Sequence, residues 1–260
     1  MTADEQIARW KVEEQAAHIR GWDFSPIHSR YTAETDLPWD YENIVRSHLE
    51  ETAALLDMDT GGGEFLLSLG HPPDKTSATE GYPPNAALCR QTLTPRGIDF
   101  RQADCRGRLP FEDSVFDMVI NRHGAYTVPE LRRVLKPGGL FVTEQVGEDN
   151  DRDLVELLLP GTPKPFPGQH LTEQARRFRE GGFAILWAEE AFRPIRFFDV
   201  GALVWFARII EWEFPGFSVD ACADRLLQAQ GILEERGAVQ GTIHRYLIVA
   251  RRTGAQSKTE

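Results

Sequence analysis

The stretch Leu55-Leu56-Asp57-Met58-Asp59-Thr60-Gly61-Gly62-Gly63-Glu64 decides how the rest of the chain is interpreted. It begins as a short apolar run, continues into three consecutive glycines and ends where a helix is expected. Glycine lets a backbone approach a ligand closely, and the N–H groups at the start of a helix favour a carboxylate or a phosphate. The stretch therefore predicts a ligand-binding turn between a buried strand and a helix. A tight turn without a ligand is the alternative.

Short apolar runs alternate with helical segments from about residue 52 onward. This alternation predicts βαβ units around a parallel sheet, so the fold class is α/β within a single domain spanning residues 1–260. Strands are expected at residues 53–58, 75–79, 98–102, 116–121, 139–146, 183–190 and 242–251. Helices are expected at residues 64–69, 84–93, 127–135, 151–159 and 171–180.

Residues 1–50 precede the alternating pattern and are interpreted as an N-terminal helical extension. A capping box formed by Thr2 and Glu5 predicts a helix over residues 3–20 that ends at Gly21. Asp40 is suited to cap a second helix. An aromatic, proline-containing stretch joins the two helices.

A second segment, residues 191–241, interrupts the pattern before the last strand and holds nearly a third of the 26 aromatic residues. Helices are expected to start near Asp199 and near Ser218, the second ending at Gly237. Together with the stretch Tyr31 to Tyr41, this helical insertion is a candidate lid over a ligand and an apolar acceptor pocket. Packing of the rings against the sheet, or a homodimer interface, is the alternative.

Composition limits the classes of function. The chain has 29 Lys and Arg against 40 Asp and Glu, a net charge of −11, which disfavours nucleic acid as a partner. Three cysteines far apart in sequence indicate neither a disulfide framework nor a metal site, and they fit a reducing cytoplasm. No apolar run approaches the length of a membrane span, and the N-terminus lacks the apolar core of a signal peptide.

Two acids at expected strand ends indicate the kind of ligand. Glu80 closes the second expected strand, where a carboxylate can accept hydrogen bonds from both hydroxyls of a ribose, and Asp104 closes the third, where it can meet an adenine amino group. No lysine follows the glycines as a phosphate-binding loop requires, and Asp59 and Leu66 occupy outer glycine positions of a dinucleotide fingerprint. An adenosine-type cofactor other than NAD is therefore favoured.

At this point the sequence resembles the class I S-adenosylmethionine-dependent methyltransferases, over roughly residues 50–190 and the last strand. Four ordered blocks carry the resemblance: the glycine-rich stretch 56–63, Thr79-Glu80-Gly81, the run from Ala103 through Leu109-Pro110-Phe111 to Val119, and Glu130-Leu131-Arg132-Arg133-Val134-Leu135-Lys136-Pro137-Gly138-Gly139-Leu140-Phe141. The resemblance implies a Rossmann-like, doubly wound, seven-stranded sheet. Its last strand would be antiparallel and inserted between strands five and six.

The resemblance also implies how S-adenosylmethionine would be held. Gly61 and Gly63 would lie against its methionine part, Glu80 would hold the ribose, and Asp104 with Cys105 would edge the adenine. The cofactor-binding set it implies is Asp57, Asp59, Thr60, Gly61, Gly63, Glu80, Asp104, Cys105, Asn121 and Arg122. Asn121, Arg122 and His123 would stand beside the sulfonium.

Asp59 occupies a position where the family commonly has glycine. Aspartate tolerates the left-handed backbone region better than most residues, so the turn can survive. Its carboxylate would then either attract the ammonium group of the cofactor or crowd the site.

Catalysis in this family is chiefly alignment of a nucleophile with the methyl group, with a general base only where the acceptor is protonated. His123, at the end of the fourth expected strand, is the first candidate to orient or deprotonate the acceptor, and Glu144, near the end of the fifth, is the second. A structural, hydrogen-bonded histidine is the alternative for His123, and a structural role is the alternative for Glu144. His244 is expected to pack within the last strand.

The predicted function is methyl transfer to a small or medium organic acceptor. Methylation of RNA or protein is one alternative, and a catalytically inactive cofactor-binding protein is another. The densest basic cluster, Arg176, Arg177 and Arg179, is expected to be a solvated helix face.

Overall fold

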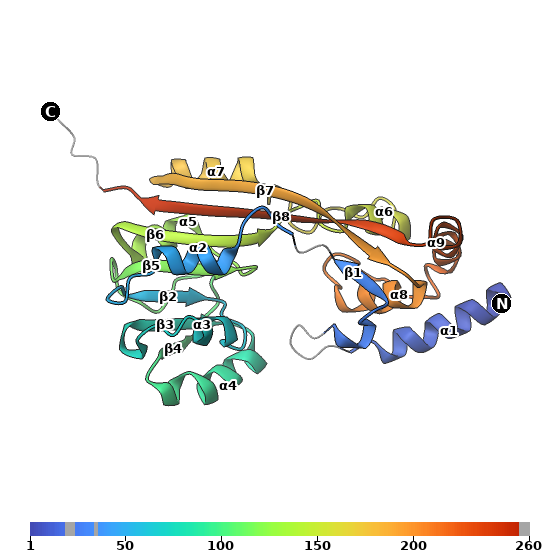
Figure 1. The fold of residues 1–260 in the computed structure, drawn as a ribbon, viewed down its shortest axis with the longest axis horizontal. Helices are drawn as coiled ribbons and strands as arrows, with labels where there is room; N and C mark the ends of the chain where they lie inside the picture. The colour runs from blue at the N-terminus through green and yellow to red at the C-terminus, as the bar shows by residue number, and fades with distance from the viewer. Residues whose placement is uncertain (19–23, 34–35, 255–260) are drawn as a thin grey trace. The chain divides into compact units, whose positions relative to one another are not determined.

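The computed structural model describes residues 1–18, 24–33 and 36–254 of the chain (Figure 1). Within them, the α-helices are α1 (Ala3–Ala16), α2 (Tyr41–His48), α3 (Glu64–Ser68), α4 (Pro83–Thr92), α5 (Val128–Val134), α6 (Arg152–Leu158), α7 (Leu171–Glu180), α8 (Val200–Ile209) and α9 (Ala223–Arg236). The strands are β1 (Tyr31–Ala33), β2 (Leu55–Met58), β3 (Thr76–Glu80), β4 (Asp99–Gln102), β5 (Phe116–Arg122), β6 (Leu135–Val146), β7 (Phe183–Phe197) and β8 (Val239–Arg252).

The strands form one sheet in the order β1-β7-β8-β6-β5-β2-β3-β4. Strands β4, β3, β2, β5 and β6 are parallel to one another, with pairs such as Asp57 with Ile120 and Asp57 with Ala78. Strand β8 runs antiparallel to β6 and lies between β6 and β7. The predicted α/β class, parallel sheet and antiparallel last strand are therefore confirmed.

The prediction of seven strands missed one. Residues Tyr31 to Ala33 form the short strand β1, which pairs antiparallel with Ile195 to Phe197. This pairing also explains why β7 extends to Phe197, through the first seven residues of the segment 191–241, which the sequence assigned to the insertion. The partner that completes this end of β7 lies more than 160 positions away, so local periodicity does not contain the signal.

Helix boundaries were predicted with mixed success. The Thr2–Glu5 capping box is confirmed, as are the Asp40 cap, the Asp199 start and the Gly237 stop. The first helix, however, ends at Ala16 rather than Gly21, and Gly21 itself lies outside the described residues.

The start of the last helix near Ser218 was also wrong. The Ser218 hydroxyl accepts the N–H of Ala221, 3.1 Å away, and this forms a separate turn before α9 begins at Ala223.

Packing divides the chain into two compact units. The first comprises residues 1–37, 147–167 and 191–244, and the second comprises residues 38–146, 168–190 and 245–260. The N-terminal extension up to residue 37 and the whole segment 191–241 thus fall in the same unit. The sequence did not predict that residues 147–167 belong to the same unit as these two segments.

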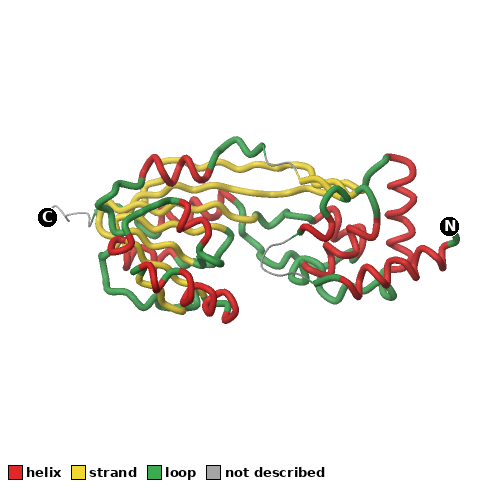
Figure 2. Tube along the Cα trace, turned by 60° about the horizontal axis from the view of Figure 1, so that its bottom comes forward, coloured by secondary structure: helices red, strands yellow, loops and turns green. Residues whose placement is uncertain are grey.

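In the second unit, helices pack on a sheet (Figure 2). Side chains alternate across a strand, so Leu56 and Met58 of β2 face one side while Leu55 and Asp57 face the other. On the first side they pack with α5 and α7 through Leu131 and other residues of one buried apolar cluster, including Val119, Val134, Phe141, Phe178 and Ile248. At the carboxyl ends of the strands, this arrangement leaves room for the loops that follow them.

The first unit has its own core, built from α1, α6, α8, α9 and the end of β7. Helix α8 is buried on nearly every side, as its apolar sequence predicted. Five of the eight aromatic side chains of the segment 191–241 are buried in this core: Phe197, Trp205, Phe206, Phe214 and Phe217. These five rings therefore pack in the core of the first unit, which was the alternative to a lid.

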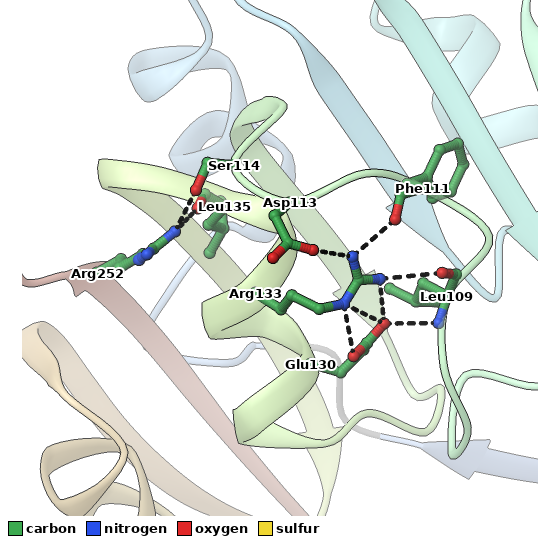
Figure 3. A network of polar contacts seen from close by, with 8 residues as sticks. All are labelled: Leu109, Phe111, Asp113, Ser114, Glu130, Arg133, Leu135 and Arg252. Carbon is green, nitrogen blue, oxygen red and sulfur yellow. Dashed lines mark hydrogen bonds and ion pairs between the residues drawn. The ribbon is translucent and has the colours of Figure 1, made fainter.

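Arg133 of α5 joins two of the sequence blocks that defined the resemblance (Figure 3). Its guanidinium donates to the carbonyl oxygens of Leu109 and Phe111, at 3.0 and 2.7 Å, and to the carboxylate of Asp113 at 2.7 Å. Glu130, one turn earlier, accepts from Arg133 at 3.0 Å and from the N–H of Leu109 at 2.7 Å. One arginine thus ties the loop before β5 to the helix after it.

We expect Arg133→Ala to lower the free energy of unfolding by roughly 2–4 kcal/mol, because it leaves Glu130 and two loop carbonyls without their charged donor. Urea denaturation measures this change. The matched control is Arg176→Ala on α7, whose pairs with Glu173 and Glu180 are screened by solvent and should contribute little to stability. Equal losses in the two variants would contradict the assignment of Arg133 as a buried tie.

Candidate functional site

The candidate site lies at the carboxyl ends of the parallel strands of the second unit. Residues 57–63 end β2 and follow it, Glu80 ends β3, Asp104 follows β4, Arg122 ends β5 and Glu144 lies near the end of β6. Parallel strands place these ends along one edge of the sheet, where open α/β sheets bind ligands. All the predicted site residues therefore come from one edge.

The turn after β2 depends on three left-handed residues. Asp59, Gly61 and Gly63 have φ values of 55°, 64° and 86°. Asp59 thus adopts the backbone that a glycine would take, as expected for aspartate. A Cβ added at Gly61 would meet nothing within 4 Å, whereas at Gly63 it would lie 2.8 Å from Cδ2 of Leu93. Gly61 therefore presents an open backbone face, whereas Gly63 packs against the Leu93 side chain, and both have a positive φ that favours glycine.

Glu80 binds the turn from the neighbouring strand. One of its carboxylate oxygens accepts the N–H of Gly61 at 2.9 Å, and the other accepts the N–H of Tyr82 at 2.7 Å. The side chain is buried. Each carboxylate oxygen has two acceptor positions, so each keeps one for a further donor. Two acceptor positions therefore remain on the Glu80 carboxylate.

Two more carboxylates crowd the same turn. Asp57 is buried, with Thr60 donating to it at 2.6 Å, and burial raises its pKa to about 7, while the charges of Asp59 and Glu80 act in the same direction. Burial also raises the pKa of Asp59, whose carboxylate accepts the N–H of Ala125 at 2.9 Å. A bound cation would relieve this repulsion, whereas a phosphate would increase it.

The residues after β4 divide between surface and interior. The carboxylate of Asp104 is exposed and accepts hydrogen bonds from Arg106, which lower the pKa of Asp104 to about 2. Cys105 is buried beside Thr79, with its Sγ 3.3 Å from the threonine hydroxyl. Asp104 is thus the most solvent-accessible of the predicted cofactor contacts, and its carboxylate already has a charged partner.

Asn121 holds three strands together. Its amide donates to the carbonyl oxygen of Met58 at 2.8 Å, and its side-chain oxygen accepts from Gln145 at 2.6 Å. Tyr41 of α2 donates to the Asn121 carbonyl at 3.2 Å. The fully buried side chain therefore positions β2, β5 and β6. Sequence reasoning missed both Gln145 and Tyr41, which no local motif marks.

Glu144 is the centre of a polar network at the ends of β5 and β6. Trp39 donates to one carboxylate oxygen at 2.7 Å, while Arg122 and His123 approach the other at 3.2 and 3.3 Å. Burial opposes ionisation of Glu144, but the hydrogen bonds from His123 and Trp39 and the charge of Arg122 lower its pKa to about 2. The sequence placed Trp39 only in the candidate lid stretch Tyr31 to Tyr41, and its contact with Glu144 was not predicted because 105 positions separate the two residues.

His244 belongs to the first unit. Its ring is fully buried, stacks on Phe192 with centroids 4.3 Å apart, and accepts the N–H of Asp149 at 3.1 Å. A Cβ at Gly147 would lie 2.2 Å from the ring. The expected packing role agrees with these contacts.

Comparison with known proteins shows what this chain is similar to. Residues 56–143 match the family described as Methyltransferase domain. A phthiotriol/phenolphthiotriol dimycocerosates methyltransferase of Mycobacterium tuberculosis is 33% identical over 113 residues, which cover 40% of each protein. A sterol 4-C-methyltransferase of Caenorhabditis elegans is 31% identical over 116 residues, or 40% of this chain and 34% of that protein. The chain thus matches well under half the length of these relatives.

A solved structure from Bacillus halodurans C-125, itself named only provisionally as a methyltransferase, shares the fold. It has a TM-score of 0.58 at 16% identity and covers 83% of this chain and 99% of its own. The match over residues 56–143 and the shared fold agree with the resemblance to the class I S-adenosylmethionine-dependent methyltransferases that the sequence indicated. Residues 56–143 are therefore similar to a methyltransferase domain.

The raised pKa of Asp57 predicts a pH-dependent stability. The pKa of the Asp57 carboxyl is about 7 in the folded chain and about 3.9 in the unfolded chain. Its contribution to the free energy of unfolding is therefore fully present below about pH 3.9 and is lost as the pH rises through about 7. Asp57→Asn cannot ionise and can still accept from Thr60. We expect it to exceed the wild type in unfolding free energy at pH 8, by at most about 4 kcal/mol, and to equal it near pH 4.

Urea denaturation at the two pH values measures the difference. Asp104→Asn, at an exposed carboxylate with a charged partner, is the control and should show no such gain at pH 8. If Asp57→Asn changes the free energy of unfolding equally at both pH values, Asp57 is not a buried carboxyl that resists ionisation.

Proposed function

We propose that this protein transfers a methyl group from S-adenosylmethionine to a small or medium organic acceptor. The observation that carries the proposal is the concentration of carboxylates from Asp57, Asp59 and Glu80 around an open glycine turn. S-adenosylmethionine brings two cationic groups, a sulfonium and an ammonium, to a nucleoside. Such a ligand supplies the positive charge that the turn lacks.

The residues fit this cofactor without rearrangement of their backbone contacts. Glu80 would accept both ribose hydroxyls through the acceptor positions left by Gly61 and Tyr82. Asp57, Asp59 and Thr60 would face its cationic part, and the open face of Gly61 would admit its methionine part. Asp104 and Cys105 would edge the adenine, and Asn121 and Arg122 would border the sulfonium side.

When bound, S-adenosylmethionine supplies an electrophilic methyl group. The task of the chain is then to orient an acceptor and exclude water from the carboxyl edge of the sheet. His123, which follows β5, is the residue we propose to face the acceptor, and Glu144 of β6 is the residue we propose to orient it. The segments 1–50 and 191–241 remain our candidates for covering it.

Several observations favour a small acceptor over a nucleic acid. The net charge is −11, and in the basic cluster of α7, Arg176 and Arg177 are paired with Glu173, Arg176 also with Glu180. The relatives described above are named for lipid and sterol substrates. None of the described helices is both long and apolar enough to cross a membrane. All three cysteines are free thiols, which favours a reducing compartment such as the cytoplasm.

Isothermal titration calorimetry with S-adenosylmethionine tests the proposal. We expect one site per chain, and Glu80→Ala should weaken binding at least tenfold because both ribose hydrogen bonds are lost. Glu112→Ala, at an exposed carboxylate before β5, is the control and should bind as the wild type does. Unchanged affinity in Glu80→Ala would refute the ribose assignment, and no binding to the wild type would refute the function.

A further inference from the structure

His123 is held in an unusual position beside Glu144. Its φ is 58°, a left-handed conformation that costs energy for a residue with a side chain, and its N–H donates to the carbonyl oxygen of Glu144 at 2.9 Å. The ring Nε2 lies 3.3 Å from Oε1 of Glu144. The Glu144 side chain is 4% exposed, whereas that of His123 is 32% exposed. One edge of the imidazole is therefore buried against a carboxylate, and the ring remains open to solvent elsewhere.

This contact fixes which nitrogen carries the proton. An ionised carboxylate only accepts hydrogen bonds, so this contact favours the proton on Nε2 when the ring is neutral. Nδ1 then carries a lone pair, and among the described residues it has no hydrogen-bond partner. The ring therefore offers Nδ1 as a hydrogen-bond and proton acceptor.

The loop that carries His123 is attached to the glycine turn. Asp59 accepts the N–H of Ala125 at 2.9 Å, and its side chain touches Gly124, where an added Cβ would lie 2.6 Å from the Asp59 Cβ. Residues 124 and 125 thus lie against the turn in which the cofactor is proposed to bind, and His123 directly precedes them in the chain.

The charges facing the ring favour its neutral form. Burial lowers the pKa of His123, the Glu144 carboxylate raises it in part, and the charges of Arg245 and Arg122 lower it again. Arg122 comes from β5 itself, Glu144 from β6 and Arg245 from β8. At neutral pH the ring is therefore a free base.

Given the proposed function, we propose that His123 is the general base for acceptors that react through a hydroxyl group, and that Glu144 is its positioning residue. In the transfer, the acceptor oxygen forms a bond to the methyl carbon while the carbon–sulfur bond breaks and its electron pair stays on sulfur. The hydroxyl proton passes to Nδ1 of His123 and is later released to water. The imidazolium formed in between lies against the Glu144 carboxylate, which stabilises it.

Glu144 itself does not serve as the base. One of its oxygens faces Arg122 and His123, the other accepts from Trp39, and its side chain is almost fully buried. An oxygen engaged by these donors has little affinity for another proton. The two catalytic candidates therefore divide into a base and the residue that orients it.

Nitrogen NMR of the histidine-labelled protein tests the arrangement without turnover. In the wild type at pH 7.5 we expect the His123 ring to show a protonated Nε2 and an unprotonated Nδ1, assigned by loss of the signals in His123→Asn. Asparagine is chosen because it tolerates the left-handed backbone. Glu144→Gln should lower the midpoint of the His123 titration by about one pH unit or more, because the neighbouring negative charge is gone.

Glu173→Gln, on α7, is the matched control and should leave the titration unchanged. A proton on Nδ1 in the wild type overturns the proposal whether or not Glu144→Gln folds. An unchanged titration in a folded Glu144→Gln overturns it as well.

A pair of phenols tests the role of the base. With S-adenosylmethionine at pH 8, His123→Asn should lower kcat/KM for phenol by roughly 100- to 10,000-fold. For 4-nitrophenol, which is already largely ionised at this pH, the loss should stay below about tenfold. Equal losses for the two phenols overturn the assignment of a base.

Binding separates this inference from the function on which it rests. His123→Asn should bind S-adenosylmethionine as the wild type does, measured by calorimetry. Binding by the wild type without methylation of either phenol overturns the hydroxyl-acceptor inference alone. Absence of binding by the wild type overturns the proposed function.

Discussion

Repulsion among buried carboxylates at the carboxyl edge of the sheet is the constraint on which the site depends. Asp57 is enclosed by the sheet and the turn, Asp59 and Glu80 are its neighbours, and burial keeps Asp57 from ionising readily. A protein gains no stability from such a cluster by itself, since each charge is costly to bury. A bound cation would make the arrangement favourable, which is why we propose a cationic nucleoside as the ligand.

The same side chains that hold the turn also prepare it for a ligand. Glu80 secures Gly61 through a backbone hydrogen bond and keeps further acceptor positions, and Asp59 secures the loop of residues 123–125 through Ala125. The glycine turn, the strand end at Glu80 and the loop that carries His123 are therefore connected by hydrogen bonds within one compact unit. A ligand at Glu80 and a base at His123 would share one framework, in which backbone contacts limit the movement of each part.

The predictable features are those determined by neighbours in sequence. The Thr2 and Asp40 caps, the Gly237 stop and the glycine turn each involve residues a few positions apart, and the parallel sheet follows from repeated short apolar runs. Strand β1, the tie made by Arg133 and the Trp39–Glu144 hydrogen bond were not predicted. Each joins residues about 20 to 165 positions apart, and only the folded chain brings their partners together. The sequence also could not distinguish an open glycine at 61 from a packed one at 63.

The most direct measurement of the central claim is a crystal structure of this chain with S-adenosylhomocysteine. The account predicts the ribose hydroxyls on the Glu80 carboxylate, the amino-acid part along Gly61 beside Asp57 and Asp59, and the sulfur toward the end of β5. A nucleoside bound elsewhere, or an edge of the sheet left empty because the Asp59 side chain fills the turn, would contradict it.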